Sequence, residues 1–561
     1  MLKFFPTIVS AVLAVQAVFA VNITQTIPVA KTLNGSYHGV HIEPLNQDLF
    51  LGIPFAEPPV KDLRFANPRS LNITWQGSLP ATNYAPRCVG YGSAQQGFQQ
   101  NEDCLYLNIV RPAGYENESL PLLVWIHGGG FSEGGGSDMR FNLSFIVNNS
   151  VSIGKPIMAA SVAFRLGPFG FMSGDKVAEE GSSNAGLKDQ RMGLHWLKEN
   201  IAGFGGDPEK ITLWGQSSGA ASVGRQLFAF NGRNDNLFRA AIMMCGTAIF
   251  AGPDRSTEYY QPRFDSLVKA TGCEEHANTL ACIRQLPYAV LNNILNTTSF
   301  NFEWFPIVDG DFTARHSMMK EHPLHNPPTA RKLSSPKSTA SNINPIALVF
   351  LKLTPLTATS VGQIAWPADI LSRLVRLYTE DKEYEIPSAV SMGGNVSLGP
   401  PYGAFWRRSA AYAGDYVFIA ARRLNCQTWA SAGIPAYCYR FNAFSNIFRW
   451  PLRAGHTAEN TFAFANVQGL GEGDTNPLAN KPQSYFDLAY FMSSSLASFA
   501  HDLNPNGWQG RDAAIESWPA YDLASPKNLV FDANVTSHLE PDTYRAEGIK
   551  LINDNNHLQH R

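Results

Sequence analysis

A serine lies in a short glycine-bounded motif in the middle of the chain. Residues Gly215–Gly219 read Gly-Gln-Ser-Ser-Gly, after the apolar run Ile211–Trp214 and before the helix-forming segment Ala220–Val223. A strand, a sharp turn that carries a serine and a helix form a nucleophile elbow, which exposes the hydroxyl near the positive end of the helix. Flanking glycines leave room for the strained turn and for close packing of strand and helix. The motif predicts Ser217 as a nucleophile.

A second glycine-rich motif also follows an apolar run. Residues His127–Phe131 read His-Gly-Gly-Gly-Phe and directly follow Leu122–Ile126. Consecutive glycines let the backbone approach a substrate and direct N–H groups inward, which an acyl-transfer enzyme needs where the oxyanion of its tetrahedral intermediate forms. Side-chain packing in a core does not require a glycine-rich motif after each of two apolar runs. Together they favour acyl transfer over a structural explanation.

Composition and charge narrow the class of protein. Apolar residues make up 44% of the 561 residues and charged residues 16%, as in a globular protein. The formal net charge of −2 gives no reason to expect nucleic acid or an acidic membrane surface as a partner. Apolar runs alternate with longer helical patterns, which indicates an α/β fold. Because no repeat or internal linker divides the chain, we expect one large domain.

The N-terminus has the features of a signal peptide. Lys3 supplies the positive start, Phe4–Phe19 the apolar core, and Val18–Ala20 a small-x-small cleavage site. The apolar stretch is short for a bilayer span, so we expect no integral membrane anchor. The sequence predicts a leader over 1–20, a single mature domain over 21–561 and secretion to the extracellular space. Sequons that fit this route occur at Asn22, Asn34, Asn72, Asn117, Asn142, Asn148, Asn296, Asn395 and Asn534.

The seven cysteines suggest disulfides in a secreted chain. Two pairs bracket short loops, Cys88 with Cys104 and Cys273 with Cys282. The three that remain are an odd set, so at least one thiol is free, and Cys245 is the favoured one because it lies in an apolar run. A metal site is the rival interpretation, but no Cys-x-x-Cys or His-x-x-x-His pairing supports it. The other two members of the odd set are Cys426 and Cys438.

Longer motifs occur in a fixed order around the serine. Residues Glu102–Asn108 read Glu-Asp-Cys-Leu-Tyr-Leu-Asn, and Asn184–Arg191 read Asn-Ala-Gly-Leu-Lys-Asp-Gln-Arg. Asn200–Pro208 then runs into the serine motif, and Gly52–Pro59 lies upstream. This set resembles the type-B carboxylesterase/lipase family, which includes cholinesterases and secreted fungal esterases and lipases. The resemblance implies an α/β-hydrolase fold, with a mostly parallel central sheet and helices on both faces.

The resemblance implies a role for each residue of the two glycine motifs. Ser217 matches the nucleophile, and the N–H groups of Gly129, Gly130 and Ser218 match the oxyanion hole. The family usually has alanine where this chain has Ser218, but a backbone N–H does not depend on the side chain. An acyl-Ser217 intermediate that water hydrolyses requires no metal and no cofactor.

A late histidine matches the general base of the family. Residues Gly455–Glu459 read Gly-His-Thr-Ala-Glu. The order of nucleophile and then histidine fits the fold, so His456 is expected to take the Ser217 proton and return it to the leaving alcohol. Glu459 resembles a structural position, and we do not expect His456 and Glu459 to bind a metal.

The resemblance also predicts covalent and ionic pairs. An unpaired charge in an apolar motif is costly, so charged residues of the matched segments are expected to pair. The predicted buried ion pairs are Arg64–Glu102 and Arg165–Asp189, and the predicted disulfides are Cys88–Cys104 and Cys273–Cys282.

The third member of the catalytic triad is missing where the family has a Glu or Asp. The chain contains no acidic residue between Glu321 and Asp369. Residues 323–345 are basic, rich in Ser and Pro, and without an amphipathic period, which is typical of a segment that does not pack. Two interpretations compete: the enzyme works without this acid or recruits another, or the stretch departs from the functional protein, as an out-of-frame segment would. We favour the second, and Asp309 and Asp311 are the nearest upstream carboxylates.

The sequence therefore favours a secreted serine esterase whose partner is a small-molecule or lipid ester. A non-catalytic binding protein on the same fold is the alternative from another class, and the missing acid supports it. A triacylglycerol lipase is the alternative for the substrate. The Cys88–Cys104 loop is short and has few large apolar residues, whereas lipases of the family carry an amphipathic lid there, so soluble esters are favoured.

Overall fold

The computed structural model describes most of the chain. Within the described residues, no helix combines the length and the hydropathy that a bilayer span needs. The predicted leader (1–20), the Ser/Pro-rich stretch 323–345 and the sequons at Asn22 and Asn395 lie outside the described residues. The described residues are 27–247, 249, 255–301, 304–314, 346–351, 366–378, 406–447 and 454–559. Of these, 346–351, 406, 407 and 559 are described by their backbone alone.

A large central sheet contains eleven of the described strands. Seven neighbouring strands run parallel, namely β10 (Met158–Val162), β9 (Leu120–Ile126), β11 (Gly206–Gln216), β12 (Ala240–Met244), β13 (Ile346–Leu351), β14 (Ala436–Phe441) and β15 (Lys527–Phe531). Antiparallel strands complete both edges, with β8 (Tyr106–Pro112), β4 (Gln47–Pro54) and β3 (Val40–Ile42) beyond β10, and β16 (His538–Pro541) beyond β15. The predicted α/β-hydrolase sheet is confirmed.

Alternate residues of the central strands belong to two separate apolar cores. On β9, Leu122, Val124 and Ile126 lie in one core, whereas Leu123 and Trp125 lie in the other. Strands that are buried on both faces need a layer of helices on each, because their side chains alternate across the sheet. The helices are α4 (Ala185–Asn200) and α5 (Ser218–Gly232) on one face, and α1 (Leu143–Ser152) and α14 (Gln483–Asp502) on the other.

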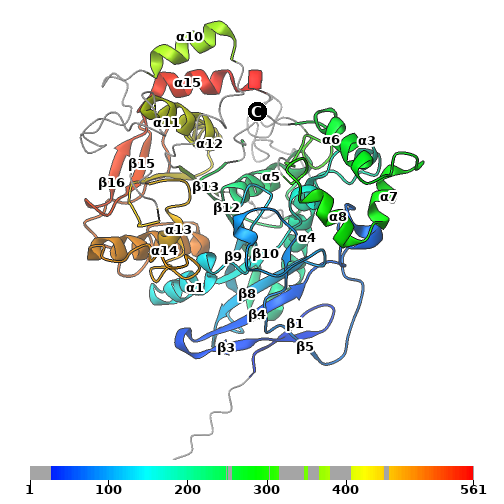
Figure 1. Ribbon diagram of the computed structural model, residues 1–561. Coiled ribbons are helices and arrows are strands. Elements are labelled where there is room, and N and C mark those ends of the chain that lie inside the picture. The colour runs from blue at the N-terminus through cyan, green and yellow to red at the C-terminus, as the bar shows by residue number, and fades with distance from the viewer. Residues whose placement is uncertain are drawn as a thin grey trace, which may run out of the picture.

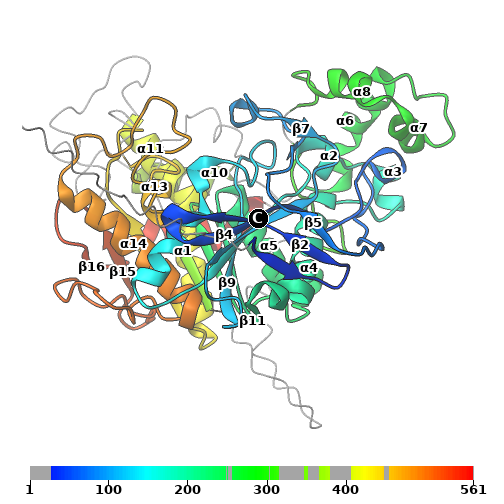
Figure 2. The same ribbon diagram turned by 90° about the horizontal axis from the view of Figure 1, so that it is seen from below.

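Further helices flank the central sheet and its two helical layers (Figures 1 and 2). One group lies to the right in both views and contains α3 (Asp175–Glu179), α6 (Thr257–Ala270), α7 (Thr279–Gln285) and α8 (Tyr288–Leu295). A second group shares a small apolar core of its own and contains α10 (Ala368–Leu377), α11 (Trp406–Gly414), α12 (Ala420–Ser431) and α15 (Ala546–Asp554). The short elements are β1 (Val29–Lys31), β2 (Ser36–His38), β5 (Ser78–Pro80), β6 (Arg87–Cys88), β7 (Gln100–Asn101), α2 (Gly167–Phe171) and α13 (Asn460–Ala463).

Three disulfides cross-link segments of the fold. Cys88–Cys104 and Cys273–Cys282 join the two pairs expected from their spacing. The third bond, Cys426–Cys438, joins α12 to β14 and uses two of the cysteines that the sequence left unassigned. Cys245 keeps its thiol.

Both predicted ion pairs form and are buried. The N–H, Nε and Nη2 of Arg165 donate to the carboxylate of Asp189 at 3.0, 2.8 and 2.6 Å. Nη2 of Arg64 donates to Oε2 of Glu102 at 2.8 Å. Because Asp189 is fully buried, its partner cannot turn to water if the carboxylate is removed.

We expect Asp189→Ala to lower the free energy of unfolding by about 3–5 kcal/mol, since it leaves the Arg165 guanidinium buried without its partner. Denaturant unfolding measures this loss. The matched control is Lys176→Ala, which removes an exposed pair with Glu179 and should change stability by less than about 1 kcal/mol. Equal effects of the two substitutions would contradict the assignment of Arg165–Asp189 as a structural pair.

A buried imidazole lies where β9 ends. His127 is 2% exposed, its ring stacks on Phe164 at 4.5 Å, and its Nδ1 donates to O of Gly128 at 2.8 Å. Burial lowers the pKa of His127 to about 4. The ring is therefore neutral at the head of the glycine loop over a wide pH range.

This lowered pKa predicts a loss of stability in acid. The unfolded state takes up the proton first as the pH falls below about 6.5, whereas the folded state resists it down to a pKa of about 4. Between pH 7 and pH 5 the free energy of unfolding should fall by about 2 kcal/mol more in the wild type than in His127→Gln. Urea unfolding at the two pH values measures both slopes, and parallel slopes would refute the prediction.

Candidate active site

Ser217 occupies a strained turn between β11 and α5. Its backbone has φ 58° and ψ −125°, which few non-glycine residues adopt. Its N–H donates to O of Met244, the last residue of β12, at 2.8 Å. A Cβ on Gly219 would lie 2.1 Å from O of Ile126, so only glycine allows the helix to approach β9 this closely. Helix α5 begins at Ser218, two residues earlier than its apolar pattern predicts, and directs its N-terminus toward the turn.

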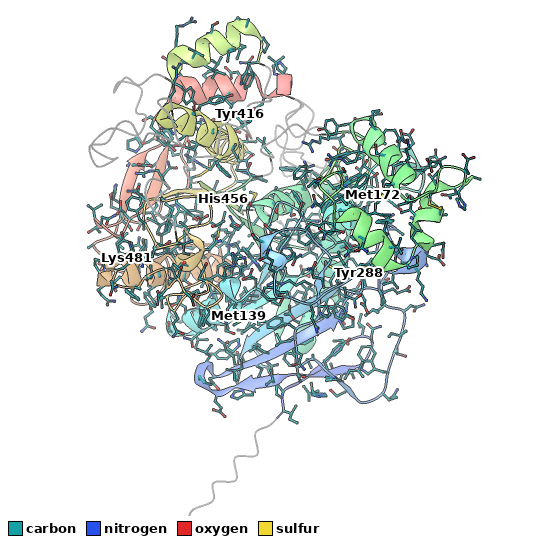
Figure 3. The ribbon with its side chains drawn as sticks, in the orientation of Figure 1. Met139, Met172, Tyr288, Tyr416, His456 and Lys481 are labelled. Carbon is teal, nitrogen blue, oxygen red and sulfur yellow. A yellow bond between two sulfur atoms is a disulfide. The ribbon has the colours of Figure 1, made fainter. Side chains whose placement is uncertain are left out.

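The structure brings His456 to this serine. Nε2 of His456 lies 2.9 Å from Oγ of Ser217. The imidazole stacks on the ring of Phe418, with 5.3 Å between centroids and 27° between planes. Phe418 belongs to a π-helical turn, Asp415–Ile419, which the sequence did not reveal as a functional element. In the view of Figure 3, His456 lies between Tyr416 and Met139, near the middle of the molecule.

The glycine loop lies beside the elbow. Gly129 and Gly130 have φ values of 109° and 62°, and a Cβ on Gly129 would lie 2.2 Å from O of Glu133. Oγ of Ser218 accepts a hydrogen bond from N–H of Phe131 at 3.2 Å. Ser218, where the family usually has alanine, therefore links the glycine loop to the elbow through its hydroxyl. Sequence reasoning missed this contact.

A thiol connects the end of β12 to the histidine loop. Cys245 follows Met244 directly, and its Sγ donates to Oε1 of Glu459, three residues beyond His456. Both side chains are buried. The sequence predicts a thiol outside the disulfides at Cys245 and identifies no partner for it. The spacing of His456 and Glu459 was the one signal that the carboxylate lies near the site.

Ser217 and His456 open into a cavity of about 670 Å³. Its walls combine apolar rings with a few charges, and Nη2 of Arg140 pairs with Oδ2 of Asp138 at 2.7 Å. Burial raises the pKa of the nearby Glu472. A mainly apolar cavity with a few oriented polar groups suits a small neutral ester. The side chains of the wall include Tyr91, Phe98, Glu133, Met139, Phe141 and Phe305.

The two candidate upstream carboxylates have other partners. Asp309 accepts from Nδ2 of Asn184 and from N–H of Thr313, each at 2.8 Å, and burial raises its pKa. Asp311 lies 3.6 Å from Nζ of Lys188. Both carboxylates thus fix their own loop, and neither is assigned as the triad acid. Among the residues that the structure describes, no three His, Cys, Asp or Glu side chains gather as metal ligands.

Known proteins resemble this chain in sequence and in fold. The model of the carboxylesterase family matches residues 23–547. Secreted lipase 1 of Botryotinia fuckeliana is 31% identical over 545 residues, which cover 90% of this chain and 88% of that protein. The Geobacillus stearothermophilus carboxylesterase EST55 is 26% identical, with a TM-score of 0.71 over 93% of this chain and 99% of its own. Aspergillus niger EstA, at 23% identity, has the same fold, with a TM-score of 0.77 over 95% and 99% of the two chains. The chain belongs to the carboxylesterase family and is a carboxylic ester hydrolase.

Proposed function

We propose that the protein is a secreted serine esterase that hydrolyses carboxylic esters through an acyl-Ser217 intermediate. The observation that carries the proposal is the 2.9 Å contact between Oγ of Ser217 and Nε2 of His456, in a turn that opens into the substrate cavity. A general base within hydrogen-bond reach of a strained serine that lines a cavity is the arrangement that nucleophilic catalysis requires.

In the acylation step, Oγ of Ser217 attacks the ester carbonyl carbon while Nε2 of His456 takes the hydroxyl proton. The oxyanion accepts hydrogen bonds from the N–H groups of Gly129, Gly130 and Ser218. The C–O bond to the alcohol then breaks, and His456 returns its proton to that alcohol. A water molecule, deprotonated by His456, attacks the acyl-enzyme, releases the acid and restores the serine. The reaction needs no metal and no cofactor.

The missing acid limits the rate in this proposal. In the parallel sheet β13 lies beside β12, so its carboxyl end reaches the edge where Ser217 lies. The chain that follows β13, 352–365, contains no Asp or Glu and lies outside the described residues. A triad that lacks the group orienting its imidazole loses about ten-thousandfold in turnover. We therefore expect slow turnover, best observed with activated esters, and a catalytically impaired or binding-only member of the family is the second candidate.

Catalysis is favoured over binding alone because the chain keeps the parts that binding does not need. A binding protein has no use for the strain at Ser217 or for two glycines with positive φ beside it. Secretion rests on the predicted leader 1–20, and the name of the Botryotinia relative, Secreted lipase 1, agrees with it. That name also supports lipid esters as candidate substrates.

We expect Ser217→Ala to abolish covalent labelling by a fluorophosphonate and to lower kcat on p-nitrophenyl butyrate by several orders of magnitude. Intact-protein mass spectrometry detects the label, and circular dichroism checks that the variant folds.

The adjacent serine provides the matched control. Ser218→Ala removes the acceptor of the Phe131 N–H but keeps the Ser218 N–H, so labelling should persist, with a rate lower by about tenfold at most. If Ser217→Ala were still labelled, or hydrolysed the ester at the wild-type rate, the proposed function would be wrong.

A further inference from the structure

Arg87 is buried beneath the loop that the Cys88–Cys104 disulfide closes. Its Nη1 donates to O of Ala94 at 2.5 Å, and its Nε donates to Oγ of Ser137 at 3.0 Å. The guanidinium also lies against the ring of Phe98, 3.2 Å from its centroid. One cation thus joins two points of the loop to the segment that follows the oxyanion glycines.

Further hydrogen bonds attach the same loop to its surroundings. The N–H of Tyr91 donates to O of Ser132 at 2.7 Å, and the N–H of Ala94 donates to Oε2 of Glu133 at 2.7 Å. Oη of Tyr91 donates to Oδ1 of Asn292, on α8, at 2.9 Å. Lifting the loop would break these contacts together and would remove the Ala94 carbonyl and the Phe98 ring from Arg87. Arg87 would keep Ser137 and the carboxylate of Asp138, 3.8 Å from its Nη2.

The outward face of the loop offers little to a lipid surface. The exposed residues Ser93, Gln96 and Gln99 are polar, and Phe98, at 41% exposure, is the only large apolar side chain of the described loop that is exposed. The Phe98 ring already lies on the wall of the cavity that contains Ser217. A lid that opens at an interface gains its energy by moving apolar surface from water to lipid, and this loop has almost none to move.

We propose that the Cys88–Cys104 loop is a fixed rim of the substrate cavity, and that Arg87 is the positioning residue that holds Phe98 against bound substrate. This inference rests on the proposed function and names its substrate class. Ser217 and His456 line the cavity with this loop in place, so the protein acts on dissolved monomeric esters and gains nothing from a lipid–water interface.

The first test measures how fast a soluble alkyl fluorophosphonate labels Ser217 of the full chain, with and without micelles of a neutral detergent. A fixed rim predicts labelling rates that agree within about twofold. A rate that rises about tenfold or more only in the presence of micelles would show a lid and overturn the proposal. No labelling under either condition would instead refute the proposed function, and this inference with it.

The second test separates KM from kcat. Phe98→Ala and Arg87→Lys should each raise KM for p-nitrophenyl butyrate about threefold or more while kcat stays within about twofold, because neither changes Ser217 or His456. The matched control is Arg233→Lys, whose guanidinium lies 4.3 Å from the Phe230 ring at a site that is not part of the cavity wall, and it should change neither constant.

Phe98→Ala decides the outcome if Arg87→Lys does not fold, because Phe98 is exposed and its removal leaves the disulfide and the Arg87 hydrogen bonds in place. An unchanged KM in folded Phe98→Ala would show that the ring does not contact substrate and would overturn its role. An equal loss of kcat and kcat/KM would overturn it as well, because it would place the effect on the transition state.

Discussion

The site depends on one crowded turn, in which the backbone around Ser217 contacts the ends of two neighbouring strands. The turn can hold φ 58° and ψ −125° because N–H of Ser217 donates to β12 and because Gly219 has no Cβ to meet Ile126 on β9. Strain of this kind costs about 1–3 kcal/mol and persists only where the surrounding structure fixes it. At this cost the turn keeps Oγ of Ser217 within 2.9 Å of Nε2 of His456.

The two apolar cores supply the rigidity that the turn requires. Alternate residues of β9 lie in different cores, so the strand end that carries the glycine loop is held from both faces of the sheet. The carboxyl ends of the parallel strands then bring the elbow, the glycine loop and the end of β12 to one edge. Side-chain bonds complete the assembly, from Ser218 to Phe131 and from Cys245 to Glu459. Each connects two catalytic segments that the sheet has already brought close.

Ion pairs and hydrogen bonds of charged side chains fix the loops around the site. Asp189 satisfies the backbone and the side chain of Arg165, and Asp138 pairs with Arg140 on the cavity wall. Arg87 combines a hydrogen bond to Ser137 with an aromatic contact and lies 3.8 Å from the carboxylate of Asp138, so several contacts hold the rim of the cavity. Because an unpaired buried charge is costly, these loops have few alternative positions. A stiff cavity agrees with hydrolysis of dissolved esters better than with a surface that rearranges at lipid.

Local patterns in the sequence determined the elbow, the glycine loop, the two short-range disulfides and the fold class, and they predict a leader that lies outside the described residues. Each depends on residues that are close in the sequence, because a strand–turn–helix motif or a short disulfide loop is specified by a short segment of the chain. Ion pairs and the His456 assignment came from motif resemblance and not from spacing.

Only the tertiary structure decided the contacts between segments that are distant in the chain. The stacking of Phe418 on His456, the hydroxyl contact of Ser218, the Cys245–Glu459 bond and the Cys426–Cys438 disulfide join separate elements. The hydrogen bond from Arg87 to Ser137 likewise joins two separate segments of the chain. No pattern in a single segment specifies these partners, because the sheet order that makes them neighbours results from packing of the whole chain.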